Sequence, residues 1–439
     1  MLDYANSAQE VPGGPFQIEL TVAPAACDPA ATYRWSVDGE QVREARGECT
    51  YVHPFEREGR YEVGLDVDGP RGARSSTRTV TVQDWLIVAI GDSIASGEGN
   101  PDRPAPDVGW QSEVCHRSAV AGTARAARRI EAADPRTSVT FVHLACSGAG
   151  LETGVLSDYR GAVPRRGAAP LPAQVAELQA VAAQREVDAV VAVAGANDVA
   201  FDPAVRFCVR FERCMDQPFD AADPLRRARG RPPLKDALAT AVGRLPGLYA
   251  RLADALGPEL GPRTYLVEYH DPLHRTRDRF CELGIPHFEI SEAEARDAYD
   301  RMLLPLNAAV RAAADAHGWR HVGGVQAEFG EGHGYCSRRT WIRRLEESVV
   351  RHGAFRRGAV LGTLHPNAHG HGAIAGRLAQ ALAAGLYPDG APLLPSGEGE
   401  SDEDAVLGVA GWVAAGIGFG ALGALLGALA TWLAMRRRR

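Results

Sequence analysis

The chain has 439 residues, of which 45% are hydrophobic and 23% charged, and its formal net charge at pH 7 is -7. These proportions exclude a disordered or collagen-like chain and fit two or three domains with buried cores. The acidic balance argues against a basic phosphate-binding surface, so nucleic acid is not expected as a partner.

The first 84 residues have the pattern of short strands. Apolar residues alternate with polar ones between residues 16 and 83, and Asp-Gly and Gly-Pro pairs separate the runs. This pattern predicts a small β-sandwich. The stretches Trp35-Ser-Val-Asp-Gly39 and Glu58-Gly-Arg-Tyr61-Glu-Val63 resemble polycystic-kidney-disease-type (PKD) domains, immunoglobulin-like modules often appended to secreted bacterial hydrolases. The resemblance implies a PKD/Ig-like spacer or weak binding module over 1–84.

Residues 85–388 alternate between apolar runs and helical patterns. Candidate buried strands are 85–90, 138–144, 187–194, 264–269 and 319–322. Candidate helices lie around 118–133, 172–184, 234–256, 291–317 and 367–385. The alternation predicts an α/β fold, a three-layer α/β/α sandwich with a parallel five-stranded sheet. Sites in such folds form beyond the carboxyl ends of the strands.

Residues with catalytic chemistry follow these strands. Ser93 ends the first strand in Gly-Asp-Ser, where it could act as a nucleophile, although the same turn is ordinary helix-capping chemistry. Gly148 and Asn197 follow the second and third strands and offer N–H donors of the kind that an acyl-transfer oxyanion needs. His365 lies in a loop before a proline, and its imidazole could take the serine proton.

The order Ser93, Gly148, Asn197, His365 resembles the four sequence blocks of the SGNH hydrolases, also called GDSL lipases/esterases. The resemblance covers residues 85–388. It implies Ser93 as nucleophile, His365 as base, and an oxyanion hole formed by the Ser93 N–H, the Gly148 N–H and the Asn197 side chain. The implied activity is hydrolysis of carboxylic esters, in a lipid or an acylated glycan, without a cofactor.

One position departs from the pattern of the family. Many members carry an aspartate three residues before the histidine, and this chain has Gly362 there. A catalytic dyad without a dedicated acid is therefore expected. The second nitrogen of His365 would donate to a backbone carbonyl, such as that of Gly362, as in actinobacterial lipase-like members of the family.

The eight cysteines contain no Cys-x-x-Cys spacing, so they favour disulfides in an oxidising compartment over a zinc ribbon or a redox site. Cys27 and Cys49 fall within the N-terminal unit and are expected to pair. The resemblance to the lipase-like members implies the remaining pairs, Cys115–Cys146, Cys208–Cys214 and Cys281–Cys336.

Other candidates for chemistry are weaker. Ser147 could be a rival nucleophile, but its surroundings lack the Gly-x-Ser-x-Gly pattern of α/β-hydrolases. His365, His369 and His371 share helical spacing, but no acidic or cysteine partner has suitable spacing nearby, so no metal site is expected. The acidic residues between 398 and 404 are explained more simply by a solvated tether.

The C-terminal segment resembles a membrane anchor. Residues 389–404 are rich in Pro, Gly, Ser and acid and predict a tether. Residues 405–435 contain no charge and exceed the roughly 20 residues that cross a bilayer as a helix. The arginines at 436–439 favour the cytoplasmic side. A single span in the cell membrane with the catalytic domain outside is expected, and a tail-anchored cytoplasmic protein is the alternative.

Two function classes remain open. The first is a membrane-anchored extracytoplasmic serine esterase or lipase that forms an acyl-enzyme on Ser93 with His365 as base. The second is a cell-surface binding or adhesion protein with a vestigial hydrolase core. The fold hosts many ester specificities, and acyl length is expected to depend on loops 150–172, 200–232 and 273–290.

Overall fold

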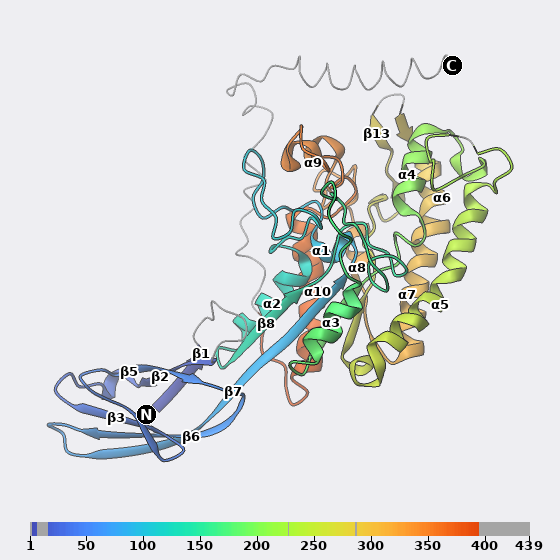
Figure 1. The fold of residues 1–439 in the computed structure, drawn as a ribbon. Coiled ribbons are helices and arrows are strands. Elements are labelled where there is room, and N and C mark those ends of the chain that lie inside the picture. The colour runs from blue at the N-terminus through green and yellow to red at the C-terminus, as the bar shows by residue number, and fades with distance from the viewer. Residues whose placement is uncertain (1, 7–15, 227, 286–287, 395–439) are drawn as a thin grey trace, which may run out of the picture. The chain divides into compact units, whose positions relative to one another are not determined.

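The computed structural model describes residues 2–6, 16–226, 228–285 and 288–394 (Figure 1). The predicted transmembrane helix over 405–435, the tail 436–439 and residues 395–404 of the predicted tether lie outside the described residues. Within the described ranges, no helix is both long enough and apolar enough to cross a membrane.

The N-terminal part consists of β-structure, as predicted. One sheet contains β1 (Leu2–Asn6), β2 (Phe16–Val22) and β5 (Thr50–Phe55). A second layer contains β4 (Glu40–Arg46), β3 (Thr32–Val37), β6 (Gly59–Asp68) and the first half of β7 (Arg74–Gly91). Buried side chains such as Tyr33, Trp35 and Val63 form a hydrophobic core of their own here. The assignment of this unit as a PKD-like domain stays a prediction.

Strand β7 makes the large sheet mixed. Its first half, through Val82, pairs antiparallel with β6, whereas its second half pairs in parallel with two strands of the α/β part. The prediction of a purely parallel sheet is therefore wrong. Alternation up to Val82 and the continuous apolar run from Trp85 look like two strands in the sequence, but they form one strand of eighteen residues whose surroundings change midway.

The α/β part contains five parallel strands in the order β8-β7-β9-β10-β15. Besides β7, these are β8 (Thr137–His143), β9 (Ala189–Val193), β10 (Thr264–Val267) and β15 (Arg320–Val322). Helices cover both faces of this sheet, so residues 86–90 and 189–193 are at most 2% exposed. These five strands agree with the five apolar runs predicted from the sequence.

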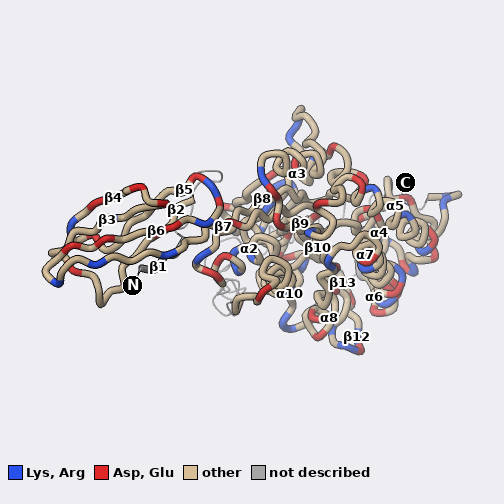
Figure 2. The backbone as a smooth tube through the Cα atoms, turned by 90° about the horizontal axis from the view of Figure 1, so that it is seen from below, with Lys and Arg blue, Asp and Glu red and all other residues tan. Residues whose placement is uncertain are grey.

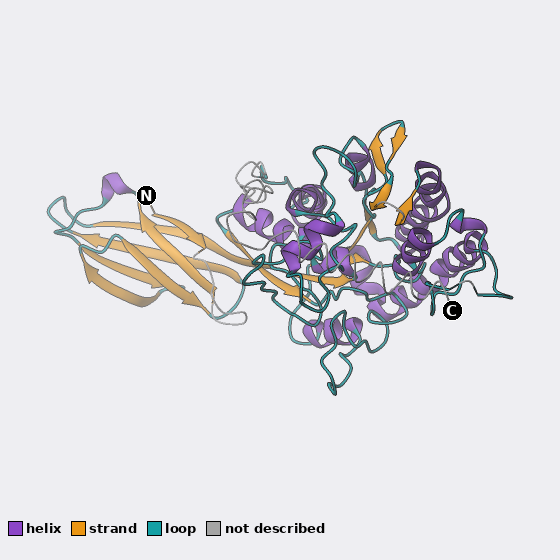
Figure 3. Ribbon diagram, turned by 90° about the horizontal axis from the view of Figure 1, so that it is seen from above, coloured by secondary structure: helices purple, strands orange, loops and turns teal. Residues whose placement is uncertain are grey.

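Two groups of helices form the outer layers (Figures 1 and 3). On one face, α2 (Gly122–Ala133) packs against α10 (Ala368–Leu386), and α8 (Val325–Gly330) contacts α10. On the other face lie α3 (Gln174–Ala182), α5 (Leu234–Leu260) and α7 (Leu304–His317), of which α5 contacts both others. The result is the expected three-layer arrangement around the parallel strands.

Several short elements interrupt the predicted loops. They are α1 (Ser93–Ser96), α4 (Phe201–Arg210), α9 (Leu345–His352) and the hairpins β11 (His274–Thr276) with β12 (Arg279–Phe280) and β13 (Leu283–Ile285) with β14 (Phe288–Ile290). The helix predicted over 291–317 consists of α6 (Glu292–Ala298) and α7, joined by a π-helical turn at residues 299–303. These elements bring residues from distant loops together above the sheet.

The four disulfides join the predicted pairs, Cys27–Cys49, Cys115–Cys146, Cys208–Cys214 and Cys281–Cys336. Cys115–Cys146 connects the loop before α2 to the turn after β8. Figure 2 shows acidic and basic residues intermingled along the described backbone. Some of them form ion pairs, such as Arg244 with Glu152 and Arg377 with Glu328.

The strand order places the functional edge of the sheet between β7 and β9. The chain leaves β7 towards α2 on one face and reaches β9 through α3 on the other. Loops that follow two such neighbouring strands diverge and leave an opening at the carboxyl edge. Ser93 and Asn197 follow these two strands.

Position 91, where β7 and β9 end, has room only for a glycine. Its φ is +129°, and a Cβ added there would lie only 1.9 Å from the carbonyl oxygen of Val193. We therefore expect Gly91→Ala to lower the free energy of unfolding by about 3 kcal/mol and to displace the turn that carries Ser93. Chemical denaturation measures the first effect.

Gly167→Ala is the matched control for this prediction. Gly167 also has a positive φ, +77°, but a Cβ there meets nothing within 4 Å. It should cost only the backbone strain, about 1 kcal/mol. Equal losses in the two variants would contradict the steric explanation.

Candidate active site

The turn after β7 presents Ser93 at the first position of α1. The Asp92 side chain caps this helix by accepting a hydrogen bond from the Ile94 N–H at 3.0 Å. The Gln174 side-chain amide forms two hydrogen bonds with Gly91, the residue before Asp92. It accepts from the Gly91 N–H at 2.6 Å and donates to the Gly91 carbonyl at 3.0 Å. Ser93 is only half-buried, so the turn is fixed while the hydroxyl remains accessible.

Asp92 and Tyr269 form a buried link that the sequence did not indicate. The Tyr269 hydroxyl donates to Asp92 Oδ2 at 2.6 Å and accepts from the Ala196 N–H at 3.0 Å. Burial raises the pKa of Asp92 to about 7, and the Tyr269 and Ile94 hydrogen bonds only partly oppose it. The link therefore ties the Ser93 turn to the turn that carries Asn197.

His365 lies next to Ser93, as predicted. Its Nε2 is 2.7 Å from Ser93 Oγ, and its Nδ1 is 3.1 Å from the carbonyl oxygen of Thr363. A carbonyl only accepts, so Nδ1 carries the hydrogen and Nε2 of the neutral ring is an acceptor that faces the Ser93 hydroxyl. The expected backbone acceptor is present, but it belongs to Thr363. The Gly362 carbonyl accepts from the His365 backbone N–H instead, at 3.1 Å.

The loop that carries His365 is held on both sides of the histidine. Leu364 has a φ of +66°, which is uncommon for a residue with a side chain. Its carbonyl accepts from His270 Nε2 at 3.1 Å, and its N–H donates to the Arg343 carbonyl at 3.0 Å. The Arg343 N–H in turn donates to the His365 carbonyl at 2.8 Å. These bonds fix the direction of the imidazole.

Gly148 and Asn197 occupy neighbouring turns at the same edge of the sheet. Gly148 has a φ of +82°, and a Cβ there would lie 2.3 Å from the Tyr159 hydroxyl, so a larger residue would strain the backbone and displace the Tyr159 side chain. Asn197 Nδ2 donates to the Ala149 carbonyl at 2.9 Å. This hydrogen bond joins the two turns directly. The amide nitrogen carries two hydrogens, so a second donor remains for a substrate oxygen.

The Ser147 hydroxyl contacts a carboxylate instead of a histidine. It is 4% exposed, and its hydroxyl donates to Glu98 Oε2 at 2.6 Å. Serine activation requires a base within hydrogen-bond reach, and the ionised carboxylate here is already shared with His116, which lies 2.9 Å away. Glu98 and Tyr159 had no signal in the sequence, because their contacts span loops distant from one another.

His365 and His371, which share helical spacing in the sequence, have different partners in the structure. His365 contacts Ser93, whereas His371 accepts from the Gly122 N–H at 3.2 Å and donates to the Glu98 carbonyl. Within the described ranges, one different group could hold a metal ion by distance, formed by Glu98, His116 and His352. The Glu98–His116 distances of 2.9 and 3.0 Å are those of direct hydrogen bonds.

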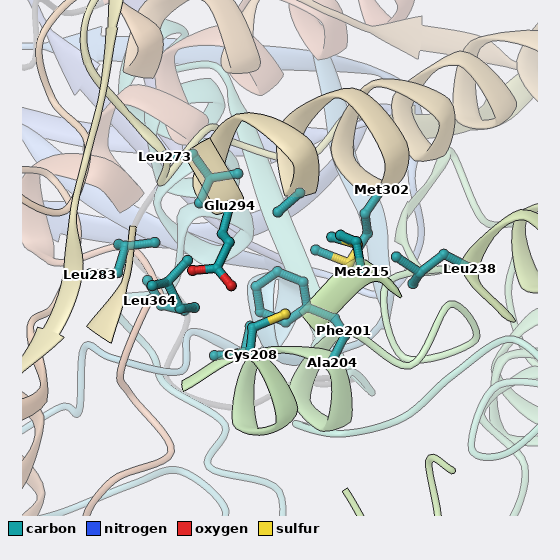
Figure 4. A pocket seen from close by; sticks show the side chains of 13 residues that line it. Phe201, Ala204, Cys208, Met215, Leu238, Leu273, Leu283, Glu294, Met302 and Leu364 are labelled. Carbon is teal, nitrogen blue, oxygen red and sulfur yellow. The ribbon is translucent and has the colours of Figure 1, made fainter. Parts of the chain in front are cut away.

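An apolar pocket lies beside the histidine loop (Figure 4). It is lined by Leu364 together with side chains of α4 such as Phe201 and Ala204, and by residues near the two hairpins such as Leu273 and Leu283. Phe201 and Ala204 belong to the loop 200–232, and Leu273 and Leu283 to the loop 273–290, two of the three loops expected to set acyl length. Glu294 contributes the only carboxylate to the lining.

The sequence model of the GDSL-like lipase/acylhydrolase family matches residues 89–373. The chain belongs to this family. It is a carboxylic ester hydrolase, with the α/β fold of SGNH-like hydrolases. The matched residues span the turns that carry Ser93, Gly148, Asn197 and His365.

Solved structures with similarity to this hydrolase include several esterases. A putative arylesterase from Agrobacterium tumefaciens is 14% identical, with a TM-score of 0.30, and the match covers 69% of this chain and 99% of that one. A carbohydrate acetylesterase from Xanthomonas citri is 11% identical, with a TM-score of 0.30 and coverages of 85% and 72%. A carbohydrate acetylesterase family member from Sinorhizobium meliloti is 14% identical, with a TM-score of 0.31 and coverages of 69% and 99%. No curated protein matches the chain.

The pH dependence of the hydrolase should follow His365. Burial lowers the pKa of His365 below the usual 6.5, and the charge of Glu98 and the Thr363 carbonyl only partly oppose this effect. A base works in its neutral form, so a lowered pKa keeps the enzyme active at more acidic pH. We expect kcat/KM to rise with pH around a midpoint below 6.5 and then to level off.

The measurement is a pH–rate profile with an ester that does not itself titrate between pH 4 and 9. A parallel measurement of tertiary structure by near-ultraviolet circular dichroism separates titration from acid unfolding. A midpoint at or above pH 7 would contradict the lowered pKa of His365.

Proposed function

We propose that the hydrolase acts through an acyl-enzyme on Ser93, with His365 as general base and then general acid. The observation that carries this proposal is the 2.7 Å contact between Ser93 Oγ and His365 Nε2, with His365 Nδ1 held by the Thr363 carbonyl. In the first step, Ser93 Oγ attacks the ester carbonyl while its proton moves to Nε2. The imidazolium then protonates the leaving alkoxide, and the alcohol departs.

The second half of the cycle uses the same groups in reverse. His365 removes a proton from water, and the resulting hydroxide equivalent attacks the acyl carbonyl. Collapse of this intermediate breaks the bond to Ser93 Oγ, which regains its proton from the imidazolium and releases the acid. The Ser93 N–H, the Gly148 N–H and the Asn197 amide are the proposed donors to the oxyanion in both halves.

The intact dyad also favours catalysis over the alternative of a binding protein with a vestigial core. A vestigial site has no need to keep Ser93 and His365 in contact, or to hold the backbone on both sides of the histidine. Contacts of Leu364 with His270 and Arg343 maintain the loop here.

Ser93→Ala should abolish turnover of chromogenic esters by the full chain produced under oxidising conditions, lowering kcat by about 10⁴-fold or more. Ser147→Ala is the control, because it removes the rival hydroxyl and should keep kcat within about tenfold of the wild type. Loss of turnover in Ser147→Ala with full retention in Ser93→Ala would reverse the assignment. No turnover by the folded wild type on any ester would favour the binding-protein alternative.

The apolar pocket supports a preference for short acyl groups, because its volume is only about 30 Å³, against roughly 150 Å³ for a cavity that holds benzene. Leu364 precedes the proposed base, and α4 begins four residues after Asn197, so two walls of the pocket adjoin the proposed catalytic groups in the chain. Carboxylic esters of acetyl and other short acyl groups are therefore the proposed substrates.

The chain-length profile of the wild type tests this proposal. We expect kcat/KM for an acetyl ester to exceed that for an octanoyl ester by about tenfold or more, because the longer chain does not fit the pocket. A higher kcat/KM for the octanoyl ester would show that the acyl group binds elsewhere.

The location is proposed from the sequence. The uncharged segment 405–435 with arginines at 436–439 supports a C-terminal membrane anchor with the catalytic part outside the cytoplasm. The four disulfides fit an oxidising compartment. The PKD-like assignment of residues 1–84 is proposed on its two sequence stretches, in the role of a spacer or weak binding module.

A further inference from the structure

Glu98 is a fully buried carboxylate at the end of the turn that carries Ser93. Its backbone N–H donates to the Ser93 carbonyl at 3.0 Å, and its own carbonyl accepts from His371 Nε2 at 3.2 Å. None of its surface is exposed. The residue is thus part of the nucleophile turn, although the dyad described above does not use its side chain.

The Glu98 side chain accepts hydrogen bonds from two other segments and lies near a third. Ser147 Oγ donates at 2.6 Å, and His116 Nδ1 lies 2.9 Å from one oxygen and 3.0 Å from the other. His352 Nδ1 is 3.5 Å away. Trp110 stacks on the His116 ring, with 4.4 Å between the ring centres, and covers the pair.

Glu98 carries a negative charge in this environment. Burial opposes ionisation, but the charge and hydrogen bond of His116 and the nearby His352 outweigh it and lower the pKa of Glu98 to about 2. A buried ionised group is costly unless it is paired and hydrogen-bonded. The site therefore maintains an anion next to the catalytic groups over the whole physiological pH range.

The contact with Ser147 acts on the proposed oxyanion hole. The Ser147 N–H donates to the Cys115 carbonyl at 2.9 Å, and the Ser147 carbonyl accepts from the Tyr159 hydroxyl at 3.1 Å. That carbonyl belongs to the same peptide group as the Gly148 N–H. In a planar trans peptide the two point in opposite directions. Fixing Ser147 at its hydroxyl, N–H and carbonyl therefore fixes the direction of the Gly148 N–H.

The charge of Glu98 also affects the pKa of His365, although the two side chains are not hydrogen-bonded to each other. It raises the pKa of His365 and so favours the imidazolium, against the larger effect of burial. The other ionisable groups facing His365 are Asp202 from α4, His270 after β10 and His371 from α10. Burial lowers the pKa of His270 to about 4 and that of His371 to about 3, so both are neutral near pH 7.

We propose that Glu98 is a positioning residue of the hydrolase, a buried anion that orients the oxyanion turn through Ser147 and stabilises the His365 imidazolium from a distance. This inference rests on the proposed roles of Ser93 and His365. In this proposal Glu98 supplies part of the negative charge that an aspartate at position 362 provides to the imidazolium in many members of the family. The Thr363 carbonyl keeps the orienting role.

The test compares Glu98→Gln with the wild-type full chain, after Ser93→Ala has established serine-dependent turnover. Gln keeps the shape and an acceptor for Ser147 but removes the charge. We expect kcat/KM to fall about tenfold with KM nearly unchanged, and the midpoint of the pH–rate profile to move to lower pH, because the imidazolium loses its anion. Glu98→Asp should restore the wild-type midpoint in part.

Ser147→Ala isolates the second effect. It keeps the Glu98 charge and removes one hydrogen bond of the oxyanion turn, so kcat should fall severalfold while the pH–rate midpoint stays that of the wild type. Glu19→Gln, at an exposed position of β2, should leave both kcat and the midpoint unchanged. Thermal unfolding of each variant reports on the fold independently of activity.

Three results would overturn the proposal. The first is a Glu98→Gln variant that folds like the wild type and keeps its pH–rate midpoint. The second is a Ser147→Ala variant with unchanged kcat. This result would remove the link to the oxyanion turn, and it can be obtained even where Glu98→Gln does not fold. Stoichiometric zinc in the purified wild type, lost in Glu98→Gln together with activity, would make Glu98 a metal ligand and likewise overturn it. A wild type without serine-dependent turnover would refute the proposed function itself.

Discussion

The close approach of β7 and β9 at Gly91 is the constraint from which the site is built. The Val193 carbonyl occupies the place where a side chain of residue 91 would be, and it accepts the Asp92 N–H at 2.8 Å. The chain must therefore turn sharply as it leaves the strand, which puts Ser93 at the start of α1 instead of in the sheet. Two contacts then join this turn to other proposed catalytic groups: Tyr269 links Asp92 to the turn that carries Asn197, and His365 lies against Ser93.

The sequence was sufficient for the residues that follow strands, because apolar runs locate strand ends and parallel strands bring these ends to one edge. The candidates Ser93, Gly148 and Asn197 were found in this way, and the proline after His365 pointed to the proposed base. The contacts that support these residues could not be predicted from strand ends. Tyr269 is 177 residues from Asp92, and Ser147 is 49 residues from Glu98. Such pairs depend on the three-dimensional path of loops that have no periodicity.

Two local features explain the errors of the sequence-based predictions. The choice between the Gly362 and Thr363 carbonyls depends on the positive φ of Leu364, which turns the Thr363 carbonyl towards the imidazole and leaves Gly362 to the His365 backbone. The mixed sheet depends on the absence of a break in β7. No residue between Val82 and Trp85 is a glycine or proline, but the expected change of domain suggested a boundary there.

The continuity of β7 limits how far the N-terminal unit can be regarded as a separable module. The predicted boundary between residues 84 and 85 cuts a hydrogen-bonded strand. Asp84, on the N-terminal side of this boundary, is 1% exposed, accepts from Ser138 Oγ at 2.5 Å and pairs with Arg185. A chimera that exchanges the sandwich must retain the strand beyond this point. Recombination at the apparent junction would leave the hydrolase with an unpaired arginine and a shortened central strand, so in this protein the architectural unit is larger than the catalytic unit.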